Sequence, residues 1–210
     1  MEATDRAGKT MNRDAGKGYK TILIDPPWQY GKWLKASRPR SKNHIPKDSG
    51  QPYKTMKVKE IRGLDIKALA AKNCELYCWT TQKYLPEVFG IIKGWGFKYC
   101  QMLTWIKNPM GTGQGGAYTA TTEFLVLARR GRMPTGFKRV DRTHWQVKRT
   151  NKHSQKPNFF HELIEQNTLP PRMEIFARKK HPGWDAIGEE IDGADVRAAI
   201  EYIKILLEGA

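Results

Sequence analysis

The chain has 210 residues, three cysteines and a formal net charge of +16. Its length fits one domain with its own core, and an odd number of cysteines without a CxxC pair argues against a disulfide framework. The polar N-terminus and the absence of 18 consecutive apolar residues argue against a secretory signal and a membrane span, so we expect a cytoplasmic protein.

The predicted elements begin with a polar, disordered tail over residues 1–18, which precedes a single domain over residues 19–210. A short β-branched run over 21–24 predicts a buried strand, and two prolines end it. The proline-containing segment 31–52 predicts a long loop, of the kind that is often functional. The elements predicted next are a helix over 60–71, a strand over 76–80, a helix over 85–92, and strands over 102–106 and 124–128.

The C-terminal part continues the same alternation. After the loop 129–152, Pro157 is expected to open a helix that turns Phe160, Leu163 and Ile164 to one face. Strands are predicted over 173–177 and 186–191, and a last helix over 195–208. Apolar strands that alternate with helices predict an α/β fold with a doubly wound, mostly parallel sheet.

The positive charge is concentrated in two segments. Residues 31–47 hold six basic residues and no acid, and residues 129–152 hold nine basic residues against Asp141, so together they carry 14 of the 16 net charges. A surface that only serves solubility would spread its charge, whereas basic loops suit a polyanion because each neutralised phosphate releases a counterion. We therefore expect loops 31–52 and 129–152 to bind nucleic acid, the alternative being two solvated loops without a partner. The aromatic residues between these charges that could stack on bases are Trp33, Phe137 and Trp145.

The most informative motif is Asp25-Pro26-Pro27-Trp28, which directly follows the first strand. Ligands of open α/β sheets bind at the carboxyl ends of strands. An exocyclic amine on a base is a poor nucleophile because its lone pair is delocalised into the ring, and two acceptors aimed at its N–H bonds would free that lone pair. The carboxylate of Asp25 and the carbonyl of Pro26 suit these roles, and Pro27 would preorganise the carbonyl. Trp28 offers a face for stacking on an unpaired or flipped base.

The motifs that follow in order are Pro52-Tyr53-Lys54-Thr55-Met56, Leu76-Tyr77-Cys78-Trp79-Thr80, Leu103-Thr104-Trp105-Ile106-Lys107-Asn108, Glu123-Phe124-Leu125-Val126, His153-Ser154-Gln155-Lys156-Pro157, Glu174-Ile175-Phe176-Ala177-Arg178, Pro182-Gly183-Trp184-Asp185 and Gly188-Glu189-Glu190. With these motifs, residues 20–192 resemble the DPPW-type N6-adenine methyltransferases, the family of the catalytic subunit of the eukaryotic mRNA adenosine methyltransferase. The resemblance implies a permuted Rossmann-like fold and transfer of a methyl group from S-adenosylmethionine to the N6 amine of adenine in DNA or RNA, with DNA as the first choice.

The resemblance also implies roles for individual residues. The catalytic loop is Asp25, Pro26, Pro27 and Trp28, and Asp25 would also contact the amine of the cofactor. Lys156 would bind the carboxylate of the cofactor. The other residues implied to bind the cofactor are Phe176, Arg178, His181, Glu189 and Glu190, and those implied to bind the substrate are Tyr53, Trp79, Trp105, Lys107, Asn108 and Glu123.

Some features depart from the family or leave alternatives open. The stretch before residue 19 is too short to match the family segment that helps bind the cofactor adenine, and Glu189 and Glu190 replace a pair that often contains amides. An inactive nucleic-acid-binding scaffold and an N4-cytosine methyltransferase are the alternative functions, and a homodimer or heterodimer stays open. His153 and His181 lack metal-ligand partners at useful spacing, so no metal site is predicted.

Overall fold

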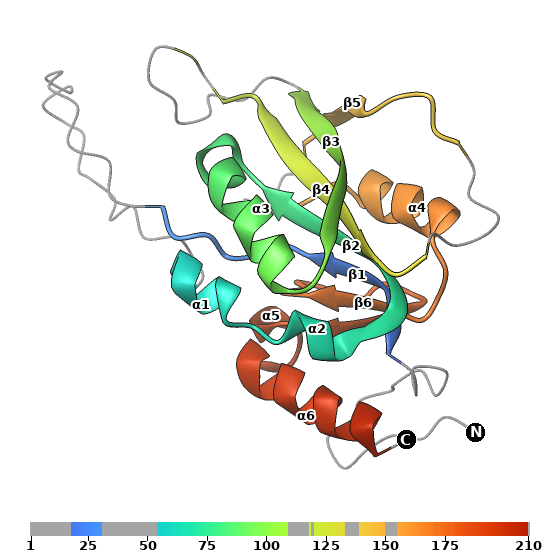
Figure 1. The fold of residues 1–210 in the computed structure, drawn as a ribbon. Coiled ribbons are helices and arrows are strands. Elements are labelled where there is room, and N and C mark those ends of the chain that lie inside the picture. The colour runs from blue at the N-terminus through green and yellow to red at the C-terminus, as the bar shows by residue number, and fades with distance from the viewer. Residues whose placement is uncertain are drawn as a thin grey trace, which may run out of the picture.

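A seven-stranded sheet forms the centre of the computed structural model (Figure 1). The structure describes residues 18–30, 54–108, 118, 120–132, 139–149 and 155–209. The tail up to residue 17, the loop 31–52, Tyr53 and parts of the second basic segment lie outside these described residues, so the predictions made for them stay predictions. In the part of the chain that is described, no helix is long and apolar enough to cross a bilayer.

The sheet has the order β5-β3-β4-β2-β1-β6-β7. Its neighbouring strands run parallel, except that β4 is antiparallel to both β2 and β3. The predicted mostly parallel α/β sheet is thus confirmed. The strands are β1 (Tyr19–Ile24), β2 (Ala70–Thr80), β3 (Lys98–Asn108), β4 (Thr122–Arg130), β5 (His144–Lys148), β6 (Arg172–Ile175) and β7 (Trp184–Ile187).

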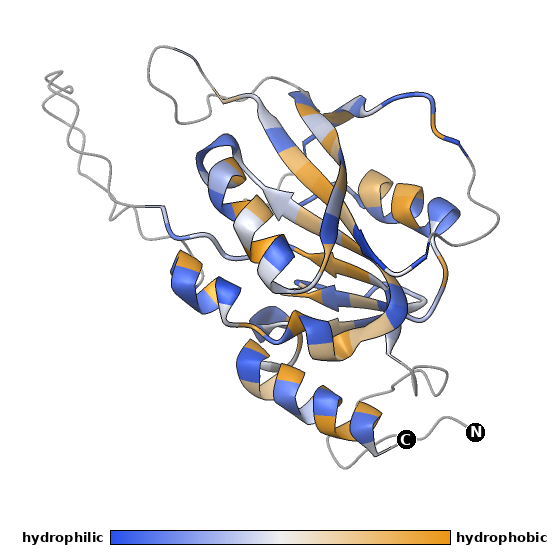
Figure 2. Ribbon diagram, viewed as in Figure 1, coloured by the Kyte–Doolittle hydropathy of each residue, from blue (hydrophilic) through white to orange (hydrophobic). Residues whose placement is uncertain are grey.

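Helices cover both faces of the sheet, as a doubly wound fold requires. Phe160 and Ile164 of α4 pack on one face against Leu23, Trp79 and other strand residues, and the remaining helices pack on the opposite face. Figure 2 shows the apolar residues along the strands between these layers. The helices are α1 (Val58–Arg62), α2 (Ile66–Leu69), α3 (Leu85–Gly94), α4 (Asn158–Asn167), α5 (Glu189–Asp192) and α6 (Val196–Glu208), with a 3-10 turn at Gln82–Tyr84.

Three predicted boundaries are wrong. The helix expected over 60–71 is two short helices, because the chain turns at Gly63, the Asp65 carboxylate caps a new helix at the Ala68 N–H, and strand β2 already begins at residue 70. The predicted loop 129–152 contains β5, whose Trp145 and Val147 pack on the α4 side of the sheet. The strand expected over 186–191 ends at residue 187, and α5 follows it.

Strand β1 lies in the middle of the sheet, between β2 and β6. Its last residue, Ile24, is fully buried, and the Asp25 N–H still donates to the Ile175 carbonyl of β6 at 3.3 Å. The chain therefore leaves the sheet at Asp25, at the carboxyl ends of three parallel strands. This position is the usual ligand-binding edge of an open α/β sheet.

Candidate active site

The loop after β1 is held in a tight turn. The Trp28 N–H donates to the Pro26 carbonyl at 2.8 Å, which closes a three-residue turn around Pro27, and the fixed φ of proline suits the centre of such a turn. The Met56 N–H donates to the Pro27 carbonyl, also at 2.8 Å. A carbonyl oxygen has two lone pairs, so the Pro26 carbonyl is fixed in direction and can accept a second hydrogen bond.

Trp28 is part of the hydrophobic core. Its ring stacks on Tyr84 at 4.7 Å between centroids, its Nε1–H donates to the Trp79 carbonyl at 3.2 Å, and only 4% of the residue is exposed. This burial disagrees with the stacking role that the sequence predicts for Trp28. The structure favours Trp28 as the anchor of the turn that holds Pro26.

A substitution separates the two roles. We expect Trp28→Ala to lower the free energy of unfolding by about 3–5 kcal/mol in chemical denaturation, because it opens a cavity in the core. The control Tyr118→Ala removes an aromatic ring that is 90% exposed and should change stability by no more than about 0.5 kcal/mol. Lost activity at unchanged stability in Trp28→Ala would instead support base stacking.

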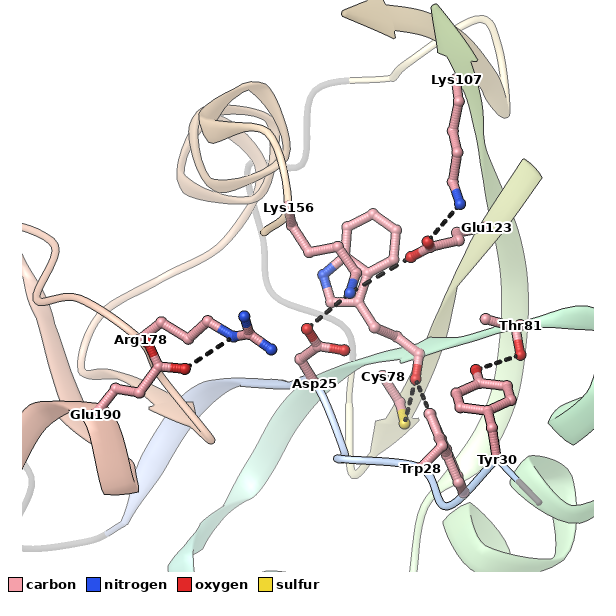
Figure 3. Close-up of polar contacts among 11 residues, drawn as sticks. Asp25, Trp28, Tyr30, Cys78, Thr81, Lys107, Glu123, Lys156, Arg178 and Glu190 are labelled. Atoms are coloured by element: carbon pink, nitrogen blue, oxygen red, sulfur yellow. Dashed lines mark hydrogen bonds and ion pairs between the residues drawn. The ribbon is translucent and has the colours of Figure 1, made fainter. Parts of the chain in front are cut away.

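Beside this turn, four charged side chains form a continuous network (Figure 3). The Lys156 Nζ lies 2.7 Å from Asp25 Oδ2 and 3.4 Å from Glu123 Oε2. The other oxygen of Glu123, Oε1, lies 2.7 Å from the Nζ of Lys107. The antiparallel direction of β4 brings Glu123, near its start, to the edge where β1 ends. Alternating charges from four separate segments therefore meet at the loop that follows β1.

Burial and neighbouring charges shift the pKa values of the groups in this network in different directions. Burial raises the pKa of Asp25, because it opposes the negative charge more than Lys156 favours it. Burial also opposes the charge of Glu123, but Lys156 and Lys107 outweigh it and lower the pKa of Glu123. Burial disfavours the ammonium of Lys156, yet Asp25 and Glu123 outweigh it and raise the pKa of Lys156. Asp25 is thus the more easily protonated carboxylate, whereas Lys156 stays charged.

Aromatic rings form the support of this network. The Lys156 ammonium lies 5.3 Å from the centroid of the Trp79 ring, and the Lys107 ammonium lies 5.6 Å from that of Trp105. Both indoles are buried and pack edge to face at 6.2 Å. The indole rings of Trp79 and Trp105 therefore lie next to the two ammonium groups and help to hold them in place. Asn108 is the last residue of β3, on the same edge of the sheet.

The residues expected near the cofactor gather where β6 and β7 end. Phe176 adopts a φ of 64°, a left-handed conformation that is costly for a side-chain residue and often marks a functional segment. Arg178 Nε lies 3.4 Å from the Glu190 carboxylate, with Glu189 exposed beside it. A Cβ at Gly188 would lie 2.1 Å from the Ala177 carbonyl, so only glycine lets these two segments approach so closely.

Two residues near the site make contacts that the sequence does not predict. His181, expected beside the cofactor, stacks on His161 of α4 at 3.8 Å. The sequence analysis does not single out Tyr30, whose hydroxyl hydrogen-bonds with Thr81 Oγ1 at 2.8 Å and whose burial raises its pKa to about 12. Its position two residues after Trp28, just beyond the turn that follows β1, is the one available clue.

Comparisons with known proteins show the family of the chain. The family model described as MT-A70 matches residues 19–190. The chain is 31% identical over 186 residues to a protein of Mycoplasma sp named "Type II methyltransferase M.MunI", and the match covers 83% of this chain and 78% of that protein. It is 28% identical over 205 residues to "N6-methyladenosine RNA methyltransferase MTA1" of Pyricularia oryzae, which covers 87% of this chain and 50% of that one.

A third relative is the mouse protein named "N(6)-adenine-specific methyltransferase METTL4". The identity is 25% over 200 residues, which covers 85% of this chain and 38% of the mouse protein. The chain therefore spans most of the bacterial relative but half or less of the two eukaryotic ones. Since the family match starts at β1 and ends in α5, it includes the turn after β1, the charged network and the segment around Arg178.

Proposed function

The chain belongs to the MT-A70 family, and we propose that it transfers a methyl group from S-adenosylmethionine to the N6 amine of adenine in a nucleic acid, with Asp25 and the Pro26 carbonyl holding the amine. The observation that carries this proposal is the charged network at the end of β1. There a half-buried carboxylate, Asp25, directly precedes a carbonyl whose direction is fixed by the Trp28 N–H. Two acceptors on adjacent residues match the two N–H bonds of an exocyclic amine.

Methyltransferases of this family use S-adenosylmethionine, and the residues present fit it. When bound, the cofactor supplies an electrophilic methyl group and its own leaving group. Lys156 carries the positive charge that a methionine carboxylate requires, and Asp25 can accept from the methionine amine. Glu189 and Glu190 are exposed carboxylates that suit the two hydroxyls of a ribose, with Phe176 and Arg178 beside them.

The protein residues contribute positioning and electrostatics. Asp25 accepts one N–H of the amine and stabilises the positive charge that develops on the nitrogen, and the Pro26 carbonyl accepts the other N–H. Both groups are held before the substrate arrives, because Asp25 is paired with Lys156 and Pro26 lies in the closed turn. Preorganisation of this kind lowers the barrier because no group has to reorient during the reaction.

The test is transfer of a tritium-labelled methyl group onto matched DNA and RNA oligonucleotides, followed by mass spectrometry of the nucleosides. N6-methyladenine in one polymer supports the proposal and names the polymer. N4-methylcytosine would support the alternative target. An inactive scaffold would show no transfer and no heat of cofactor binding in calorimetry.

We also propose that nucleic acid binds at the basic segments, where Arg139 and Arg142 are exposed. The ion pair of Arg139 with Asp141 is at the surface and therefore weak, so the guanidinium can leave Asp141 to contact a phosphate. Replacing both arginines with Ala should weaken binding at low salt and reduce the salt dependence of the affinity by about two ion contacts.

The control for this prediction is Lys72→Ala with Lys98→Ala, which removes the same charge. Both lysines are exposed and lie at or near the starts of β2 and β3, the opposite end of the sheet from Asp25. Equal losses in the two double variants, measured by fluorescence anisotropy across a salt series, would mean that the net charge and not the location of the arginines drives binding.

A further inference from the structure

Three metal-ligating side chains meet outside the site described above. They are His161 of α4, Glu174 of β6 and His181 of the loop between β6 and β7, and one ligand atom from each lies within 4.8 Å of the others. These residues are separated by 7 to 20 positions in the sequence, so no local spacing reveals them. The fold creates the cluster where α4 crosses the sheet.

The geometry points to a binding site for one divalent transition-metal ion, and we propose Zn²⁺. The His161 Nε2 lies 2.9 Å from Glu174 Oε2. Two ligands of a tetrahedral zinc ion, each at about 2.0–2.1 Å, stand about 3.3 Å apart. A zinc ion that replaces the proton between His161 and Glu174 therefore has to widen this pair only slightly. Two imidazoles and one carboxylate form a common three-residue ligand set for zinc.

The buried ring of His161 provides an independent observation. His161 is 7% exposed, and no described residue hydrogen-bonds its buried Nδ1. The proposed ion would bind the other nitrogen, Nε2, which faces Glu174. The side chains of His161 and Glu174 are 9% and 13% exposed, so an ion between them would be shielded from solvent.

His181 would complete the site by a small movement. It stacks on His161 with an angle of 16° between the rings, so its nitrogen lone pairs do not yet converge with those of His161. His181 is half-buried and can turn out of the stack towards the ion.

The ion would tie the loop after Arg178 to α4. The same two segments are joined at the surface by Lys179, whose Nζ donates to Asn158 Oδ1 at 2.7 Å. Trp184 packs its edge against His161 at 5.6 Å and shields the cluster. The ion would therefore hold these two segments together, with water as its fourth ligand, and its binding does not depend on the proposed methyl transfer.

The test uses the full chain after treatment with a chelator. Calorimetry with Zn²⁺, and visible absorption with Co²⁺ as its spectroscopic substitute, should show one ion per chain for the wild type and an increased melting temperature. In His181→Ala and Glu174→Gln the affinity should fall at least about tenfold. The control is His144→Ala, which removes an exposed histidine of β5 and should bind like the wild type.

Two results would overturn the inference. One is that the wild type binds no ion. The other is that His181→Ala binds as tightly as the wild type while circular dichroism shows that both are folded. Because His181 is only half-buried, its loss should leave the fold intact, and Glu174→Gln checks the site through a second residue that keeps its shape.

Discussion

Replacing Asp25 with Asn should lower kcat by at least about a hundredfold while the protein stays folded. The amide keeps the shape of the carboxylate but loses the charge that stabilises a developing positive charge on the amine. Burial already disfavours the negative charge of Asp25, so the neutral amide should not destabilise the fold through desolvation. The measurement is steady-state transfer of a labelled methyl group, with a melting curve for each variant.

The matched control for this prediction is Glu162→Gln, which neutralises an exposed carboxylate on α4. It should leave kcat unchanged, because it lies on the surface and outside the charged network. A kcat for Asp25→Asn within tenfold of the wild type would sink the assignment of the loop, whereas loss of folding in that variant would redirect the test to Asp25→Ser.

Replacing Lys156 with Met should weaken the binding of S-adenosylmethionine roughly 10–100-fold, the loss expected for one charge-assisted hydrogen bond. It also leaves Asp25 and Glu123 without their shared ammonium, so a loss of stability of about 3–5 kcal/mol is expected alongside. Calorimetry should show the same loss for S-adenosylhomocysteine, because both ligands carry the methionine carboxylate.

A ligand control separates a lost contact from a damaged fold. Methylthioadenosine lacks the carboxylate, so its affinity should be equal in the wild type and in Lys156→Met. The protein control is Lys180→Met, at an exposed position in the loop that follows β6. If Lys156→Met lowers the affinity for methylthioadenosine as much as that for S-adenosylmethionine, Lys156 supports the pocket as a whole and does not act through the carboxylate.

The elements of the fold were predictable where one local pattern decides the structure. The apolar β-branched run before Asp25 predicts a strand and forms β1. The apolar repeat over 85–92 predicts a helix and forms α3. The sequence analysis does not predict β5, because this strand depends on its pairing with β3. The basic residues around it favour a loop, although the apolar Trp145 and Val147 alternate with polar residues as in a strand. Residues 188–191 were misassigned because the close approach of Gly188 to Ala177 is a tertiary contact.

The site was predictable by its residue types but not by their connections. The order of motifs named Asp25, Glu123, Lys107 and Lys156, yet nothing in the sequence shows that Glu123 bridges the two lysines, because that bridge depends on the direction of β4. The sequence predicts that Trp28 of the catalytic loop offers a face for base stacking, since an aromatic side chain after prolines fits a stacking surface. Its burial depends on Tyr84, 56 positions later in the chain.

The position of β5 inside the second basic segment has a thermodynamic consequence. Arg149 follows directly after β5 and lies seven positions before Lys156, so the proposed nucleic-acid contacts and the proposed cofactor contact are close in the chain. Two ligands that contact neighbouring positions of the chain can change each other's affinity. If nucleic acid raises the affinity for S-adenosylmethionine by some factor, the cofactor must raise the affinity for nucleic acid by the same factor.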